Sequence, residues 1–174
     1  CRVHRASTQL CSASRVPLAA QGTPPCLLSA LGDSNTCNTN FTQGAKQWIE
    51  HLHSELRNHY NTQKVLLCNA GVSGDTILDG LKRFRSDVER FRPDCCIVAM
   101  GSNDAKRVSN QDFEAGLHRC IDRLETLGCS ILVRTSTPVL EYEPQPGHIW
   151  QGASELCEKN AINLKVAEDR DLAA

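Results

Sequence analysis

The stretch CLLSALGDSNT, residues 26–36, decides how the rest of the chain can be interpreted. Its first six residues are mostly apolar, and the prolines at 24 and 25 cannot donate the hydrogen bonds of a sheet, so a buried strand is predicted to begin at Cys26. Gly32, Asp33 and Ser34 then follow as turn-forming residues. The sequence therefore places a serine hydroxyl where a buried strand gives way to a loop.

Further apolar runs follow along the chain, and amphipathic segments separate them. Their spacing predicts strands in alternation with helices, which is typical of a parallel sheet that is covered by helices on both faces. Pro93 is expected to end the second helix, because a proline disfavours helical geometry in the residue before it. We therefore predict a three-layer α/β sandwich, with strands over residues 26–31, 64–68, 95–100 and 130–133, and helices over residues 42–60, 77–91, 109–128 and 154–167.

Polar turns follow three of the predicted strands, and they carry Ser34, Gly74 and Asn103. Ligands of open parallel sheets bind beyond the carboxyl ends of the strands, so these turns are expected to lie at one binding crevice. A hydroxyl nucleophile, a glycine whose N–H can approach a ligand closely and a side-chain amide donor suit attack on an acyl carbon and stabilisation of the resulting oxyanion. Asp33 and Asp104 are expected to hold loop backbone.

These turns read Gly-Asp-Ser at 32–34, Gly-Val-Ser-Gly at 71–74 and Gly-Ser-Asn-Asp at 101–104, and together they resemble the first three signature blocks of the SGNH (GDSL-type) hydrolases. The resemblance spans about residues 26–140. It implies a flavodoxin-like parallel sheet and a serine ester hydrolase that works through an acyl-enzyme on Ser34. The backbone N–H groups of Ser34 and Gly74 and the amide of Asn103 would form the oxyanion hole.

The resemblance also implies that no metal or cofactor is required and that the substrate is a small-molecule, carbohydrate or lipid ester. Acyl length and leaving group depend on loops that no motif identifies. Residues 39–46 and 141–150 are expected to form the pocket walls. Cys37 is expected to line the pocket, and Trp150 either stacks on a sugar or packs in the core or at the rim.

A serine nucleophile needs a general base, and here the sequence departs from the family pattern. The last block of the family is Asp-x-x-His, and no aspartate of this chain has a histidine three residues later. The chain ends about where a fifth strand would begin, so we expect a truncated domain that lacks its last strand and helix and is weak or inactive in catalysis. His148 is the candidate for a surrogate base, with Glu141 and Glu143 nearby; alternatively, it lies at the surface or lines the pocket.

Three functions therefore remain open from the sequence. The first is the serine ester hydrolase, and the second is a binding module on the same scaffold that holds an acylated sugar or lipid without turning it over. The third is a flavodoxin-like nucleotide or phosphate binder, although the chain has neither a GxGxxG motif nor a P-loop lysine. Ser34 could also serve only to close a turn.

The composition of the chain bears on its partners, its cysteines and its cellular setting. The 174 residues carry a formal net charge of -1, which argues against nucleic acid or anionic membranes as main partners, and no apolar stretch is long enough to span a membrane. The ten cysteines contain no CxxC pair, so those in apolar runs are expected to be small buried hydrophobic residues. This usage weakly favours a reducing, cytoplasmic setting. The sequence does not indicate an oligomeric state.

One domain over residues 26–174 is expected, preceded by a leader over residues 1–25. The leader contains arginine and serine but no acidic residue, a composition that also fits an organelle transit segment.

Overall fold

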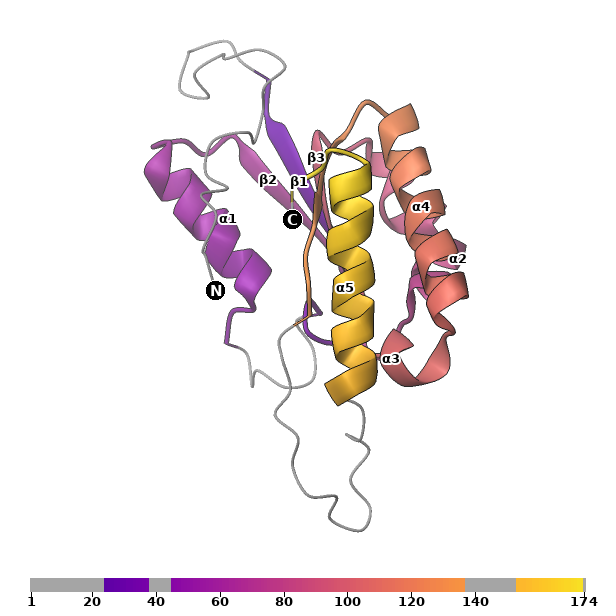
Figure 1. The fold of residues 1–174 in the computed structure, drawn as a ribbon. Coiled ribbons are helices and arrows are strands. Elements are labelled where there is room, and N and C mark those ends of the chain that lie inside the picture. Colours follow the sequence, from indigo (N-terminus) through magenta and orange to yellow (C-terminus); the bar gives the residue numbers. More distant parts are fainter. Residues whose placement is uncertain (1–23, 38–44, 137–152, 174) are drawn as a thin grey trace.

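The computed structural model describes residues 24–37, 45–136 and 153–173 (Figure 1). All but the last two residues of the predicted leader, much of the predicted pocket walls, and His148 lie outside these ranges. The described part contains a parallel sheet in the order β2-β1-β3-β4. Its strands are β1 (Cys26–Gly32), β2 (Val65–Gly71), β3 (Cys95–Ala99) and β4 (Ser130–Val133).

Helices cover both faces of this sheet, as the sequence predicts. Figure 1 shows α1 on one side of the strands and α2, α4 and α5 together on the other side. The described part therefore has the predicted three-layer α/β architecture. The helices are α1 (Trp48–His59), α2 (Ile77–Asp87), the short α3 (Asp104–Arg107), α4 (Asn110–Thr126) and α5 (Ala153–Asp169), and a 3-10 turn, η1, spans Glu89–Phe91.

Some predicted boundaries are wrong for local reasons. The second helix does not continue to Phe91 but ends at Asp87, and Phe91 in the following 3-10 turn is 46% exposed. Helix α1 starts at Trp48, because Gln47 and Glu50 form a capping box that fixes its first turn. Strand β2 is longer than predicted and runs to Gly71, where it still pairs with Gly32 of β1.

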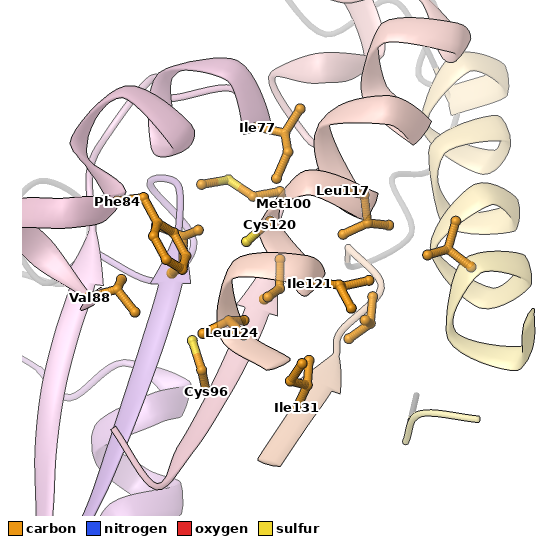
Figure 2. Packing of buried hydrophobic residues seen from close by; sticks show 14 of the residues in the cluster. Ile77, Phe84, Val88, Cys96, Met100, Leu117, Cys120, Ile121, Leu124 and Ile131 are labelled. Atoms are coloured by element: carbon orange, nitrogen blue, oxygen red, sulfur yellow. The ribbon is translucent and has the colours of Figure 1, made fainter. Parts of the chain in front are cut away.

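Alternation along the strands divides the apolar residues between two clusters. Leu28, Ala30 and Ile97 face α1 in the smaller cluster, together with Ile49 of that helix. The larger cluster fills the space between the sheet and α2, α4 and α5 (Figure 2). Its fully buried helix residues include Ile77, Phe84, Phe113, Leu117, Ile121 and Leu124.

Three cysteines belong to this larger cluster, as expected for small buried hydrophobic residues: Cys96, Cys120 and Cys129. Burial raises the pKa of the Cys120 and Cys129 thiols to about 12, so both are neutral thiols at physiological pH. The cysteines in this cluster therefore act as packing residues.

The register of the sheet brings the functional turns to one edge. Gly32 of β1 lies beside Gly71 of β2 and beside Ala99 of β3, so the chain leaves all three strands at the same carboxyl edge. On the far side, Ala173 forms a parallel bridge with Leu132 of β4, and its carbonyl accepts a hydrogen bond from Val133 N–H at 2.9 Å. This bridge lies where the next strand was expected to begin.

Candidate active site

The turn after β1 carries Ser34 and is fixed by its own backbone. The Asp33 carbonyl accepts hydrogen bonds from the N–H groups of Thr36 at 3.0 Å and Cys37 at 2.9 Å, and the Asp33 carboxylate accepts one from Asn35 N–H at 2.8 Å. The end of β2 packs closely against this turn, since a Cβ atom on Gly71 would lie 2.5 Å from the Cys37 nitrogen. A glycine is therefore needed at 71 for the two strand ends to meet.

The turn after β2 presents Gly74. Asp75 N–H donates to the Val72 carbonyl at 3.3 Å, and Gly74 occupies the third position of this turn with a φ of 83°. This φ is the value that a type II turn requires at that position, and glycine adopts it without strain. Helix α2 begins directly afterwards, with Thr76 as its N-cap and Asp79 completing a capping box.

The chain after β3 carries Asn103 and Asp104; Asn103 contacts the turn after β2, and Asp104 contacts the start of α2. Asn103 Nδ2 donates to the Asp75 carbonyl at 2.9 Å, and Asp104 Oδ1 accepts from Ile77 N–H at 2.8 Å. An amide nitrogen carries two N–H groups, so one N–H of Asn103 has no acceptor among the described residues.

Serine hydroxyls and an amide connect the remaining turns. Asn35 Nδ2 donates to Ser102 Oγ at 2.9 Å, and Ser102 Oγ donates to Ser136 Oγ, beyond the end of β4, at 3.1 Å. The structure therefore brings together the three turns that carry Ser34, Gly74 and Asn103, in contact with the segment that follows β4.

Two of the backbone donors at these turns have no acceptor among the described residues. Neither the N–H of Ser34 nor that of Gly74 donates to another described residue. The Ser34 hydroxyl likewise has no hydrogen-bond partner in the described part of the chain, and its side chain is only half-buried. These groups are thus available to a ligand.

Two carboxylates at this edge of the sheet are buried: Asp33 in the serine turn and Asp104 at the start of α3. Asp33 is 1% exposed and Asp104 is 0% exposed, and each has one oxygen without a hydrogen-bond partner among the described residues. Burial raises the pKa of Asp33, against the opposing hydrogen bond from Asn35 N–H, and burial also raises the pKa of Asp104 to about 6. Asp33 thus holds loop backbone at Asn35, as expected, whereas Asp104 holds the first N–H of α2, at Ile77.

The described histidines do not supply a base for Ser34. His51, His53 and His59 lie on α1 and His118 lies on α4, as the sequence predicts. His53 Nε2 instead hydrogen-bonds to the Val65 carbonyl at 2.8 Å, at the amino end of β2. His148 and Trp150 lie outside the described residues.

Two arginines at the site gave no signal in the sequence. Arg83 of α2 contacts the ends of β1 and β2, and Arg107 of α3 donates to the Gly74 carbonyl. Arg83 lies on a predicted helix and Arg107 on a short one, and an arginine on a helix usually faces solvent. Only their contacts in the folded structure distinguish these two arginines from the others.

The described residues contain no group of three or more histidine, cysteine, aspartate or glutamate side chains placed to hold a metal ion. Within the same ranges, no helix is long and apolar enough to cross a membrane.

This arrangement defines an α/β protein with a candidate nucleophile and hydrogen-bond donors at the carboxyl edge of a parallel sheet. Residues 30–173 match the model of the GDSL-like Lipase/Acylhydrolase family, and the chain belongs to this family. The resemblance that the three sequence motifs indicate is thereby confirmed.

A curated relative is the uncharacterized lipoprotein YqeF of Bacillus subtilis (strain 168), which is 31% identical over 123 residues. The match covers 64% of this chain and 49% of that protein, so the chain spans about half the length of this relative.

Solved structures share the fold. A lipase/acylhydrolase from Enterococcus faecalis superposes with a TM-score of 0.68 at 21% identity, covering 85% of this chain and 74% of that one. A catalytic mutant of Axe2, an acetylxylan esterase from Geobacillus stearothermophilus, gives a TM-score of 0.73 at 20% identity, covering 86% of this chain and 75% of that one. The acetyl xylan esterase AlAXEase gives 0.69 at 21% identity, with coverage of 84% and 75%. The predicted SGNH-type fold is thus confirmed.

Proposed function

We propose that this chain is a serine ester hydrolase domain that forms an acyl-enzyme on Ser34. Its oxyanion hole consists of the backbone N–H groups of Ser34 and Gly74 and the side-chain amide of Asn103. The observation that carries this proposal is that these donors lie on turns that are hydrogen-bonded together, while the two backbone N–H groups have no acceptor among the described residues. The names of the esterase structures with this fold support the same class of reaction.

In the proposed reaction, Ser34 Oγ attacks the acyl carbon of an ester as its proton passes to a general base. The carbonyl oxygen becomes an oxyanion, and the three donors stabilise it because they are already fixed in place. The bond from carbon to the alcohol oxygen then breaks, and the alcohol leaves with the proton from the base. Water then attacks the acyl carbon as the base takes one of its protons, the same donors stabilise the second oxyanion, and the bond from carbon to Ser34 Oγ breaks as Oγ takes the proton back from the base.

His148 is the candidate for the base within this sequence. The segment that contains it follows β4, and Ser136 at the start of that segment hydrogen-bonds to Ser102 at the same edge as Ser34. The histidines of α1 and α4 have no hydrogen bond to Ser34 in the described part. His148 would take the Ser34 proton and return it to the leaving alcohol.

The second candidate is the non-catalytic binding module, and one observation favours it. The Ser34 hydroxyl has no base among the described residues, although the donors that would bind an acyl oxygen are in place. In this alternative, the same edge holds an acylated sugar or lipid through these donors without cleaving it.

A fluorophosphonate probe separates the two functions, because it reacts with an activated serine. We expect slow covalent labelling of the wild-type chain at Ser34, because the Asp-x-x-His block is missing from this sequence, and no labelling of Ser34→Ala; intact-mass and peptide mass spectrometry detect the adduct. An intact fold of Ser34→Ala, shown by circular dichroism, is the control. A folded wild-type chain that is not labelled would contradict the hydrolase and favour the binding module.

The base is tested in the same assay. His148→Gln should lower the labelling rate constant by at least about a hundredfold, since general-base catalysis contributes roughly 10²–10⁴-fold. His118→Gln, on α4, is the matched control and should label at the wild-type rate. Equal rates for the His148 variant and wild type would exclude His148 as the base.

A further inference from the structure

The guanidinium group of Arg83 contacts two strand ends and the loop that carries Gly74. Arg83 lies on α2, and its side chain is only 17% exposed. Its acceptors are the Asp75 carboxylate at 2.5 Å, the Ala70 carbonyl at 2.7 Å, the Asp87 carboxylate at 3.0 Å and the Gly32 carbonyl at 3.2 Å.

Two of these acceptors mark the points where the functional turns begin. Gly32 is the last residue of β1 and directly precedes the serine turn, while Ala70 is the last residue but one of β2. The Gly32 carbonyl also accepts a hydrogen bond from Val72 N–H at 3.0 Å, so it joins the exit of β2 to β1. The side chain of Arg83 therefore hydrogen-bonds to the carboxyl ends of both strands, the points where the chain exits β1 and β2.

The third acceptor lies next to a proposed oxyanion donor. Asp75 follows Gly74, and its side chain is 15% exposed, so its ion pair with Arg83 is largely buried. Asp75 N–H closes the turn on Val72, and the Asp75 carbonyl accepts from Asn103. The carboxylate, the N–H and the carbonyl of Asp75 are thus all held, which fixes the peptide group that joins it to Gly74.

We propose that Arg83 is a positioning residue for the oxyanion hole, because its guanidinium joins the exits of β1 and β2 to Asp75 and so fixes the Gly74 turn relative to the Ser34 turn. This inference rests on the proposed function. Only a planar guanidinium, with its five N–H donors, can reach carbonyls and carboxylates in different directions at once; the ammonium of a lysine is a compact point charge. The fourth acceptor, Asp87 on the same helix, orients the group.

Arg83→Lys and Arg83→Met test this role, with Arg170→Lys and Arg170→Met as matched controls. Arg170 follows α5, is 25% exposed and forms ion pairs with Asp122 and Glu125 at 2.7 and 2.6 Å. It thus resembles Arg83 in burial and pairing but contacts no residue of the three turns. Two readouts are compared: NMR hydrogen exchange of the Val72 and Asp75 amides, and the rate constant of fluorophosphonate labelling at Ser34.

We expect exchange of the Val72 and Asp75 amides to become about tenfold faster in both Arg83 variants than in the Arg170 variants, because local opening of the loop exposes these amides. Labelling of folded protein should slow by about tenfold in Arg83→Met and by less in Arg83→Lys. The Arg170 variants should keep the wild-type labelling rate.

Two results would overturn the inference. The first is faster exchange with an unchanged labelling rate, which would leave Arg83 a purely structural residue while the proposed function stands. The second is unchanged exchange in the loop. A wild-type chain without labelling contradicts the proposed function itself, and the catalytic part of this inference fails with it. If Arg83→Met does not fold, Asp75→Asn removes the charge of the partner and should give the same two changes.

Discussion

Two regions of this molecule bury side chains to a similar extent, but burial has opposite effects on stability in them. They are the larger apolar cluster, between the sheet and α2, α4 and α5, and the carboxyl edge of the sheet. In the cluster, Leu117 and Ile121 are fully buried against other apolar side chains (Figure 2). At the edge, Asp33 and Asp104 are equally buried, yet each has a carboxylate oxygen without a partner among the described residues. Burial stabilises the fold in the first region and costs free energy in the second.

The comparison therefore predicts that the cluster determines stability and that the edge determines chemistry. Changes in the cluster should lower the free energy of unfolding and leave the reactivity of the folded protein intact. Changes to the proposed donors at the edge should lower the reactivity of Ser34, and removing a buried charge there should raise the free energy of unfolding.

The largest effect is expected for Leu117→Ala in the cluster. Removing this fully buried side chain should lower the free energy of unfolding by about 2–5 kcal/mol, because transfer and cavity terms add. Leu66→Ala, at a residue that is 49% exposed on β2, is the control and should cost much less. Urea unfolding measures both. A lower labelling rate constant for folded Leu117→Ala would break the division between the two regions.

Asn103→Ala at the edge should mainly affect reactivity. Loss of one oxyanion donor should slow labelling of Ser34 by about 10²–10³-fold, the usual effect of removing such a donor from an established oxyanion hole. Asn110→Ala is the control, since Asn110 also donates its side-chain amide, to Glu158 at 2.7 Å, but lies at the start of α4. Equal labelling rates for the two variants would remove Asn103 from the proposed oxyanion hole.

The buried carboxyl of Asp104 should make stability depend on pH. Burial raises its pKa to about 6, so between about pH 4 and 6 the folded state retains a proton that the unfolded chain has lost. Its favourable contribution is complete below about pH 4 and is lost as the pH rises through 6. Asp104→Asn keeps a neutral group there. Its free energy of unfolding should therefore rise by about 2–3 kcal/mol relative to that of wild type as the pH increases from 4 to 7.

Urea unfolding of wild type and Asp104→Asn at several pH values gives this difference directly. The charge of Asp33 also raises the pKa of Asp104, so the measured difference includes the effect of this coupling on Asp33. If the difference in the free energy of unfolding between the two proteins stays constant from pH 4 to 7, the charged form of Asp104 does not destabilise the fold.

The sequence predicts most of the architecture because its signals are local. Strand β4 has the predicted bounds, and the helix predicted over residues 109–128 is α4, which Ser109 caps by accepting a hydrogen bond from Asp112 N–H. The glycines, the serine and Asn103 were identified because each lies in a short motif directly after an apolar run. Their assigned roles remain proposals.

The sequence does not predict the contacts that join distant segments. Arg83 and Gly32 are 51 residues apart, and Asn35 and Ser102 are 67 residues apart, so no periodicity connects them. The split of the second helix at Val88 also escaped prediction, because the apolar spacing continues to Phe91 whether or not the backbone stays helical.

The smallest expected effect isolates backbone geometry at the edge. Gly74 has a φ of 83° and Gly128, after α4, has a φ of 72°, and an added Cβ at either position would lie more than 4 Å from every described residue other than its chain neighbours. Alanine at each should therefore cost only the strain of a positive φ, about 1–2 kcal/mol in urea unfolding. Gly74→Ala should in addition slow labelling of Ser34 by about tenfold, because the strained turn moves its N–H, whereas Gly128→Ala should label normally. If both variants label like wild type, the Gly74 N–H does not contact the oxyanion, and the hole would have to be built from Ser34 and Asn103 alone.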